Sequence, residues 1–579
     1  MTRGPNGPRA MTDIHDHTHL RTPIRVGPLP PTRIAEASRA FGDDWPMHTG
    51  QARQRAAGLL LMAAMSIYVP WVVMALDHDR PWVAWPFLAA TVLSMSSMAL
   101  TVVTSWSRRV PPPRPVVRGE EPHVGVIIPT CKEPVGMILR TVESILAQDW
   151  PVDRLTIIVS DDGHDPLLED SLAPYPVLYH QPPDRWAPGR DGAAKAGNLN
   201  DALAFLDRMH PEIEFVETRD ADDEVGSNGF LRHAIGQMMH DERLAYVQTI
   251  KEAQVSAGDP FVNREPMFYR GQMLSRNAAN SVFPCGSGLV WRRTALRDIG
   301  GFPVWNLVED LQSGLEALRR GWHGCFLPVV GAVGQHAPED VPNVFKQRGT
   351  WAVDTVRLLV WGNKRGLDVR QRLSFLSLLF FYLQSFALAT FMSCVVTSFM
   401  GYAPISNDRW SGFAILTGFA VVTEIWLLVT MHPYNDRRRR QRGRVKDLWR
   451  VRVLWSGMAP VYMRGVLLAL IGGPHRKPVY KVTRKHGVHV WHWQATMPHL
   501  LTAVALISSA VYSVFHHTIA DPAQLALTSV WGTLYLSYAV GFVMRGWHGS
   551  SPIPAFRAGR RATDQADAAT DIRVASATG

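Results

Sequence analysis

The chain has 579 residues, of which 46% are hydrophobic and 19% are charged, and its formal net charge is +10 at pH 7. This length allows several domains. The four cysteines, at positions 131, 285, 325 and 394, have no paired spacing, which argues against a disulfide framework and against a zinc site. The excess basic residues gather beside apolar segments, and this distribution argues against a nucleic-acid partner.

Six segments are long and apolar enough to cross a membrane as helices. Residues 58–76 and 82–106 contain no Asp, Glu, Lys or Arg. The other four segments are residues 373–400, 410–431, 497–516 and 524–544. We therefore expect a multi-pass membrane protein that lies in a lipid bilayer.

Basic residues predict how these helices are oriented. The short connections 77–81, 401–409 and 518–523 hold only Arg80 and Arg409. Basic runs follow the fourth and sixth segments, at 437–442 and 557–561. Because Lys and Arg are retained on the cytoplasmic side, the pattern predicts a plasma-membrane protein with both termini and the large middle segment in the cytoplasm.

The changes in composition predict a division of the chain into seven parts. They are a disordered tail (1–55), two membrane helices (56–110), a folded domain (120–365), two membrane helices (366–432), cytoplasmic interface helices with a loop (433–495), two membrane helices (496–547) and a cytoplasmic tail (548–579).

Apolar strands alternate with helices between the second and third membrane segments. Strands are expected at 124–128, 155–159, 215–218 and 244–250, and helices at 135–148, 193–209 and 229–239. This order predicts a Rossmann-like α/β domain with a mostly parallel sheet that is covered on both faces. Binding sites in such domains lie beyond the carboxyl ends of the strands.

Polar residues follow three of the expected strands. They are Thr130 and Glu133, then Asp161 and Asp162, then Asp220 and Asp222. Two carboxylates in an Asp-x-Asp spacing can share one hard divalent cation, Mg²⁺ or Mn²⁺, which usually arrives with substrate phosphates. Each motif alone can equally be an ordinary acidic turn. Three polar strand ends at one edge of a sheet favour a nucleotide site.

Further motifs could complete such a site. Lys195 begins a helix after a glycine-rich stretch, and a cation with free amides at a helix start can bind a phosphate or a nucleobase edge. Taken alone, the motif is equally an ordinary helix start with a solvated lysine. The small residues at Cys285 and Gly286 would let a ligand approach the backbone, or they form a β-bulge. Asp310 opens a helix at 311–320, where it is either a helix cap or a general base.

Two later segments carry aromatic and basic residues. Gln347 and Trp351 share one face of a helix expected at 343–361, where the indole is either a platform for a sugar ring or a membrane-interface anchor. Residues 480–485 form a basic, hydroxyl-bearing loop bounded by glycines. Such a loop could close over a diphosphate, although a plain juxtamembrane segment is the simpler interpretation.

In this order the motifs resemble those of the processive family 2 glycosyltransferases, and most closely those of bacterial cellulose synthase catalytic subunits. The resemblance covers about residues 124–485 and rests on PT-x-x-E, DDG, KAGNLN, DAD, FPCGSG, VED, QRGTW and YKVTRK. It implies a GT-A domain inserted between transmembrane helices. It also implies an inverting, UDP-sugar-dependent hexosyltransferase that makes a β-glucan, of the β-1,4 cellulose type from UDP-glucose, and exports it through its own channel.

Two other functions remain open. The first is a non-processive transferase, or one with another product such as a different β-glucan, a mannan or a lipid-linked sugar. The second is a transport or scaffold protein whose transferase domain has lost catalysis. The resemblance further implies a growing polysaccharide chain as a partner, and it leaves accessory or homo-oligomeric subunits open.

The resemblance implies a role for each matching residue. Asp310 would be the base, and Mg²⁺ or Mn²⁺ would bind Asp222 directly, with Asp220 nearer the ribose and diphosphate. The nucleotide-sugar would contact Thr130, Glu133, Asp161, Asp162, Lys195, Asp220 and Asp222. The pyrophosphate and acceptor end would contact Cys285, Gly286, Gln347, Arg348 and Trp351. A gating loop would contain Tyr480, Val482, Thr483 and Lys485.

The chain departs from the family pattern at three points. Thr350 stands where the family motif Gln-x-x-Arg-Trp has arginine, which removes a bidentate phosphate donor. Either Arg348 covers part of that role or turnover is low. Tyr480 replaces the usual Phe, a mild change. No PilZ domain, the family's domain that binds cyclic-di-GMP, is recognised in the tail, so the regulation typical of many bacterial cellulose synthases is not predicted.

Overall fold

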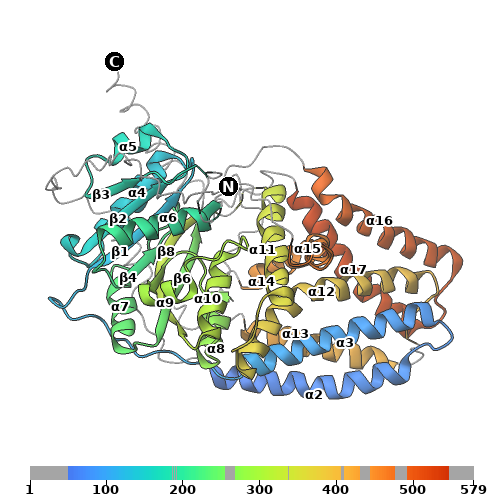
Figure 1. The fold of residues 1–579 in the computed structure, drawn as a ribbon. Helices are drawn as coiled ribbons and strands as arrows, with labels where there is room; N and C mark the ends of the chain where they lie inside the picture. Colours follow the sequence, from blue (N-terminus) through green and yellow to red (C-terminus); the bar gives the residue numbers. More distant parts are fainter. Residues whose placement is uncertain are drawn as a thin grey trace, which may run out of the picture.

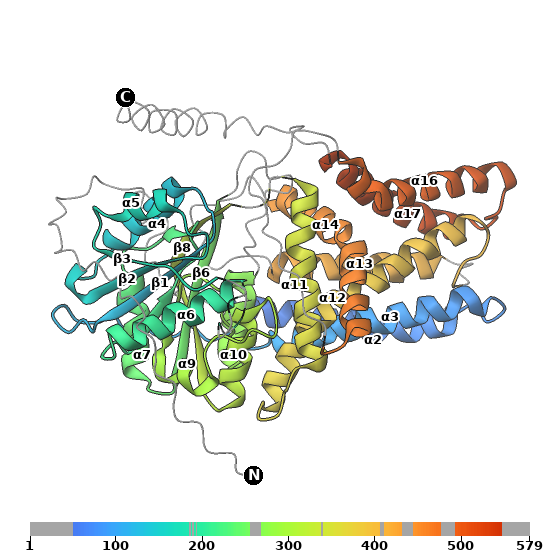
Figure 2. The same cartoon turned by 45° about the horizontal axis from the view of Figure 1, so that its top comes forward.

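The computed structural model describes residues 50–184, 187, 190, 192, 194–254, 268–336, 338, 340–405, 410–430, 444–475 and 492–546. These residues form an α/β lobe and a bundle of long helices beside it (Figures 1 and 2). The basic runs at 437–442 and 557–561, and the expected gating residues Tyr480, Val482, Thr483 and Lys485, lie outside the described residues.

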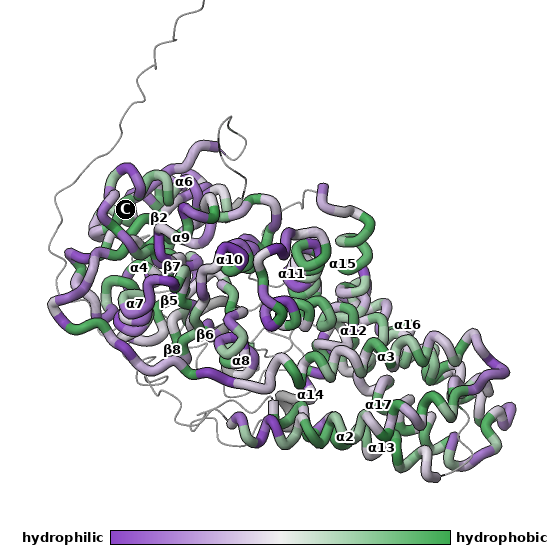
Figure 3. The backbone as a smooth tube through the Cα atoms, turned by 60° about the horizontal axis from the view of Figure 1, so that its bottom comes forward, coloured by the Kyte–Doolittle hydropathy of each residue, from purple (hydrophilic) through white to green (hydrophobic). Residues whose placement is uncertain are grey.

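In the described part of the chain, six helices are long and apolar enough to cross a membrane, at the positions that the sequence predicts. They are α2 (Gln51–Ala75), α3 (Pro81–Thr104), α12 (Val369–Phe399), α13 (Trp410–Thr430), α16 (Trp493–His516) and α17 (Pro522–Arg545). Large apolar side chains point outward from them, such as Ile67 and Phe515, which are 62% and 78% exposed. Apolar residues dominate the bundle in Figure 3. An outer surface of this kind suits lipid, so the chain is a multi-pass membrane protein.

A bent helix pair lies between the fourth and fifth of these helices. It consists of α14 (Arg444–Gly457) and α15 (Ala459–Gly472), and its apolar part bends by 43° between residues 457 and 459. Taken as one element, the pair is apolar enough to be a further span. The sequence pattern did not predict this, because a break divides the apolar run. α15 packs against α11 (Val341–Trp361), which follows the α/β lobe.

Eight strands form one sheet in the order β3-β2-β1-β4-β7-β6-β8-β5. They are β1 (Val124–Thr130), β2 (Leu155–Asp161), β3 (Val177–His180), β4 (Phe215–Thr218), β5 (Glu224–Val225), β6 (Leu244–Gln254), β7 (Leu289–Arg292) and β8 (His323–His336). Four of the seven pairings are parallel. The predicted α/β domain is confirmed, and β7 adds antiparallel pairings with β4 and β6 that the local pattern did not indicate.

Helices cover both faces of the sheet. On one face α4 (Val135–Leu146) and α7 (Phe230–His240) contribute to a core that includes Val142 and Ile235. On the other face α6 (Ala194–Met209) contributes to a second core. The remaining elements of the lobe are η1 (Val152–Arg154), α5 (Pro166–Leu172), η2 (Phe268–Gln272), α8 (Met273–Ala278), α9 (Arg293–Ile299) and α10 (Glu309–Arg319).

The strand register brings the predicted polar segments to one edge. Thr130 at the end of β1 lies opposite Asp161 at the end of β2. β4 ends at Thr218, which pairs with Ile127 of β1 and with Leu289, the first residue of β7. Because β7 runs antiparallel to β4, the segment that precedes β7 reaches the same edge as the residues that follow β4.

Candidate active site

The turn after β1 is held by its own side chains. The Glu133 carboxylate accepts hydrogen bonds from the Thr130 hydroxyl at 2.8 Å and from the Cys131 backbone N–H. Thr130 is buried and Glu133 is half-buried. Both residues therefore lie at the predicted edge, and in this conformation they order the turn.

The turn after β2 is built around the fully buried Asp161. Its carboxylate accepts backbone N–H bonds from Gly163 and Asp165, both at 2.7 Å, and the Tyr179 hydroxyl at 3.0 Å. Asp162 forms a 2.6 Å ion pair with Arg190. The hydrogen bonds of Asp161 thus order the turn from its buried side. The Asp162–Arg190 pair joins the segment before α6 to this turn. Sequence reasoning missed Arg190, which no spacing links to Asp162.

The start of α6 connects these turns to the third acidic motif. Asn198 is buried and donates to the Ser160 carbonyl at 2.9 Å and to the Thr130 carbonyl at 3.4 Å, which joins the ends of β1 and β2. Three residues earlier, the Lys195 ammonium pairs with Asp220 and lies 3.7 Å from Glu309. Burial opposes a charge on Lys195, but these two carboxylates raise its pKa above the ordinary value.

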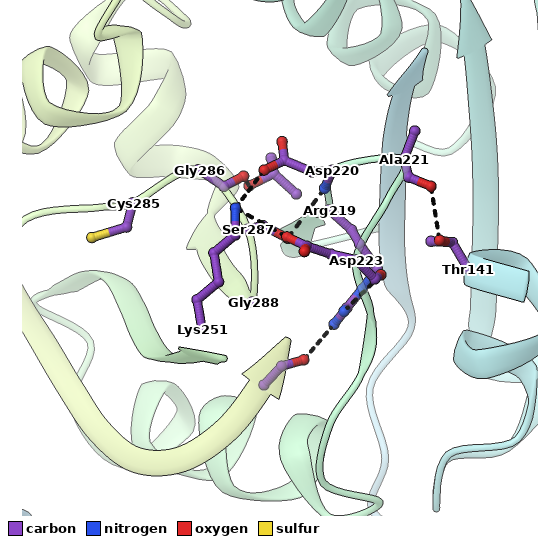
Figure 4. Close-up of polar contacts among 12 residues, drawn as sticks. Thr141, Arg219, Asp220, Ala221, Asp223, Lys251, Cys285, Gly286, Ser287 and Gly288 are labelled. Atoms are coloured by element: carbon purple, nitrogen blue, oxygen red, sulfur yellow. Dashed lines mark hydrogen bonds and ion pairs between the residues drawn. The ribbon is translucent and has the colours of Figure 1, made fainter. Parts of the chain in front are cut away.

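Asp220 is held from three sides in the turn after β4, and Figure 4 shows the contacts with Lys251 and Ser287. One carboxylate oxygen pairs with Lys195 and the other with Lys251 of β6, at 2.6 Å from its Nζ. Its backbone N–H donates to the Ser287 hydroxyl at 3.1 Å. Burial opposes the charge, but the two lysines keep the pKa of Asp220 well below its usual range. Asp222, two residues on, is half-buried.

Sequence reasoning missed two buried residues of this network. Lys251 also pairs with Asp223, at 3.0 Å, and the side chain of Asp223 is fully buried. The available signal was a lysine directly after the strand expected at 244–250, because a buried ammonium requires a carboxylate partner. Behind the turn, Arg219 is fully buried and donates to Glu217 at 2.6 Å and to the Gly331 carbonyl at 3.0 Å. These contacts fix the backbone that carries Asp220 and Asp222.

The segment before β7 passes close to these groups at Gly286. This residue has φ +84°, and a Cβ there would lie 3.1 Å from Lys195 Nζ and 3.4 Å from Asp310 Oδ2. A side chain would therefore fill the space between the lysine and Asp310. The preceding residue, Cys285, is anchored by its backbone N–H, which donates to Gln248 at 2.6 Å.

Two carboxylates stand side by side at the start of α10. Asp310 accepts the backbone N–H of Leu311 at 2.7 Å, and burial raises its pKa above the ordinary value. Burial also raises the pKa of Glu309 to about 7, with Lys195 opposing the shift and Asp310 adding to it. The predicted base is thus present beside Lys195, and it has an acidic neighbour for which sequence reasoning assigned no role.

Three of the residues predicted to contact the acceptor or the pyrophosphate lie on α11. Trp351 is 36% exposed, and the Arg348 guanidinium lies 5.8 Å from the centre of its indole ring. Gln347, four residues before Trp351, is half-buried. The Thr350 hydroxyl donates to the Lys346 carbonyl of the same helix at 2.9 Å, so this position supplies no cation.

Buried contacts tie α11 to the loop that leads into α10. Asp354 accepts the backbone N–H of Leu307 at 3.1 Å, and the Asp354 carbonyl accepts the Asn306 amide at 2.7 Å. Arg357 lies 4.1 Å from the centre of the Trp305 ring and donates to the carbonyl of Trp305 and to that of Pro474, both at 2.9 Å. The helix with Trp351 and the loop before Asp310 therefore form one joint.

A divalent cation fits the acidic turn only with ligands from a substrate. Among the described residues, no group of three or more His, Cys, Asp and Glu side chains could hold a metal ion. Asp220 and Asp222 offer hard carboxylate oxygens, although both oxygens of Asp220 already contact ammonium groups. Mg²⁺ and Mn²⁺ suit such a sparse set, because they commonly bind one or two carboxylates together with phosphates.

A family model described as "Glycosyltransferase like family 2" matches residues 122–353. The matched segment begins just before β1 and ends within α11, so it contains the whole sheet, the acidic turns, Asp310 and Trp351. Residues 122–353 are therefore similar to a family 2 glycosyltransferase domain, and candidate membrane helices lie on both sides of them.

The similar curated proteins are cellulose synthases. The chain is 28% identical over 497 residues to "Putative cellulose synthase 2" of Komagataeibacter xylinus. The matched region covers 80% of this chain and 31% of that protein. It is 27% identical to the cellulose synthase catalytic subunits (UDP-forming) of Komagataeibacter sucrofermentans and Pseudomonas fluorescens, over 70% and 80% of this chain. The chain spans 53% and 61% of those two proteins.

A solved mannosyltransferase from Pyrobaculum calidifontis, in complex with GDP-Man and Mn²⁺, also matches. Its sequence identity is 18% and its TM-score is 0.46, over 66% of this chain and 99% of that one. This overlap is too weak to carry an argument.

Proposed function

We propose that the chain is a membrane-embedded, processive, inverting glycosyltransferase that makes a β-glucan of the cellulose type from UDP-glucose and exports it between its own helices. The observation that carries the proposal is the convergence at Gly286, where a Cβ would lie within 3.4 Å of both Lys195 Nζ and Asp310 Oδ2. A phosphate-binding cation and a general base would thus face one small space. The names of the similar proteins support the donor and the product.

In this proposal Asp310 removes the proton from the terminal O4 hydroxyl of the acceptor. That oxygen then forms a bond to the anomeric carbon of the donor sugar, and the bond to the UDP oxygen breaks. A single displacement from the opposite face inverts the anomeric carbon. Lys195, which pairs with Asp220, would meet the negative charge that collects on the departing diphosphate.

The acidic turn would hold the cation and the nucleotide. Asp222 would bind Mg²⁺ or Mn²⁺ directly, and Asp220 would lie nearer the ribose and diphosphate. A bound divalent cation would neutralise charge on the leaving diphosphate. Thr130, Glu133, Asp161 and Asp162 would form or support the uridine pocket, in which the buried Asp161 acts by ordering its turn.

The acceptor end would lie against α11 and the segment before β7. Trp351 would stack on a sugar ring, and Gln347, Arg348, Cys285 and Gly286 would contact the acceptor or the pyrophosphate. Tyr480, Val482, Thr483 and Lys485 would form the gating loop. The basic connections predict that the transferase domain and both termini are cytoplasmic. Accessory or homo-oligomeric subunits are compatible with this arrangement.

The test uses membranes that contain the full chain, labelled UDP-glucose, and linkage analysis of the product. We expect a β-1,4-linked polymer, and a rate about 10²–10⁴-fold lower for Asp310→Asn, because general-base catalysis contributes that much. Asp298→Asn is the matched control, since Asp298 is exposed and bonds to Trp322. A wild-type chain that makes no polymer, or an Asp310→Asn variant as fast as wild type, would contradict the proposal. A product with one added sugar would identify a non-processive transferase.

A further inference from the structure

Lys251 is a buried cation to which the proposed reaction assigns no role. It lies in β6, and its side chain is 6% exposed. Its ammonium is 2.6 Å from one oxygen of Asp220 and 3.0 Å from one oxygen of Asp223 (Figure 4). Lys251 therefore joins the middle of the sheet to the turn that would hold the metal ion.

The two lysines on Asp220 are not equivalent. Lys195 stands at the start of α6, where its side chain is 28% exposed, and it also approaches Glu309. Its position at the edge of the site allows it to reach a bound ligand. Lys251 pairs on its other side with the fully buried Asp223, so it stays behind the turn. Lys195 can leave Asp220 and pair with a bound ligand instead, whereas Lys251 remains a fixed positive charge beside Asp220.

A fixed positive charge next to a metal-binding carboxylate weakens the attraction of that carboxylate for a divalent cation. The effect is strong here because burial reduces screening by water and salt. A diphosphate brings its own negative charges and oxygen ligands, and these compensate for the weakened carboxylate.

We propose that Lys251 is a positioning residue that keeps the affinity of the Asp220–Asp222 turn for free divalent cation low, so that the cation is held firmly only together with a nucleoside diphosphate. The inference rests on the proposed function, because it takes Asp222 as the direct metal ligand and Asp220 as the second carboxylate of the same turn. In this proposal Lys251 determines the order of binding, so that the divalent cation binds together with the nucleotide-sugar donor.

The experiment measures Mn²⁺ binding to the purified full chain by electron paramagnetic resonance, at one pH, with and without UDP. Lys251→Met removes the charge, and Lys251→Gln removes the charge but keeps an N–H donor for Asp220. Without UDP we expect both variants to bind Mn²⁺ about tenfold more tightly than wild type, as the loss of one nearby charge implies. With UDP present, the difference in Mn²⁺ affinity between the variants and wild type should become smaller. Arg154→Met is the matched control, since Arg154 is exposed at the opposite end of β2.

Equal or weaker Mn²⁺ binding by a folded Lys251 variant would overturn the inference. If neither Lys251 variant folds, Asp223→Asn provides the test. This substitution leaves the charge of Lys251 uncompensated, so Mn²⁺ binding should become weaker. An unchanged affinity in Asp223→Asn would then refute the role of Lys251. Polymer synthesis by wild type is scored separately, so failure of the proposed function is distinguished from failure of this inference.

Discussion

At the residue scale, burial affects the protonation of the proposed base and of the carboxyl group beside it. Glu309 and Asp310 are adjacent, burial raises the pKa of both, and that of Glu309 reaches about 7. A carboxyl group with a raised pKa remains protonated at a pH where an ordinary aspartate has lost its proton. We therefore expect the polymerisation rate to fall as the pH is lowered, with an acid limb at higher pH than an ordinary aspartate would give. Initial rates from pH 5 to pH 9 measure this.

Glu309→Gln tests the cause of that limb. The substitution replaces the carboxyl group whose pKa is raised to about 7 by a neutral amide, so the part of the limb that follows its protonation is lost and the limb moves to lower pH. Glu316→Gln, in the middle of α10, is the control and should leave the limb in place. If the limb does not move in Glu309→Gln, the rate is limited by another group.

Thr350 is the second residue whose chemistry can be tested directly. Its hydroxyl bonds to its own helix, and the nearby Arg348 lies over Trp351. We expect Thr350→Arg to increase kcat/KM for UDP-glucose about tenfold, because a guanidinium adds charge-assisted hydrogen bonds to phosphate. Thr350→Lys should increase kcat/KM by a smaller factor, since a lysine ammonium lacks the planar, forked donors of a guanidinium. No gain in either variant would mean that the site already has the cation it needs.

The residues that sequence reasoning predicted at this edge are those with a recognisable spacing, such as Asp220 and Asp222. Lys251, Asp223 and Arg190 were missed, because each acts through a partner that is distant in the chain or hidden by burial. Lys251 and Asp220 are 31 residues apart, and only the pairing of strands brings them together. The predicted roles of the site residues stay predictions.

At the element scale, local periodicity predicted β1, β2, β4, β6 and the longer helices of the lobe, but it did not predict β3, β5, β7 or β8. Of the missed strands, β7 lies next to the site. This strand has four residues and lies between β4 and β6 in the sheet. Its place depends on antiparallel pairing with partners far along the chain, and this information is absent from any short window of sequence. Yet β7 brings Gly286 to the site, so the missed strand completes the site.

The joint between α11 and the loop before α10 gives an element-scale prediction. Arg357 is buried and contacts Trp305, Pro474 and Asp354. We expect Arg357→Ala to destabilise the lobe by about 3 kcal/mol, because it leaves Asp354 and two carbonyls without this partner in a buried place. A lower apparent Tm of the purified chain measures the effect.

Two further variants separate the contacts of Arg357 from its charge. Arg357→Lys keeps the charge but loses the forked donor, so its apparent Tm should lie between those of wild type and Arg357→Ala. Arg365→Ala removes an exposed arginine just beyond the same helix and should leave the apparent Tm unchanged. An Arg357→Ala chain as stable as wild type would show that the joint is held elsewhere.

At the scale of the whole molecule, hydropathy alone located the six spans, because a bilayer sets a minimum apolar length. It did not identify the bent pair α14 and α15, in which neither helix is long enough by itself. The orientation in the membrane stays a prediction from the basic connections.

Labelling with a membrane-impermeant maleimide tests that orientation. A cysteine at the exposed position 78, between α2 and α3, should react in sealed right-side-out vesicles (His78→Cys). A cysteine at the exposed position 154 of the lobe should react only after the vesicles are opened (Arg154→Cys). The wild-type chain measures the background from its own cysteines. The reverse pattern would place the lobe outside the cell.

The Pro474 carbonyl has a consequence for redesign of the molecule. It accepts hydrogen bonds from the Trp305 indole at 3.0 Å and from Arg357 at 2.9 Å. Every amino acid carries such a carbonyl, so this contact specifies the path of the main chain and leaves the identity of residue 474 open. A different loop could be grafted immediately after this position and would start from the same point and in the same direction. Position 474 is therefore a natural junction for chimeras that exchange the loop and keep the lobe.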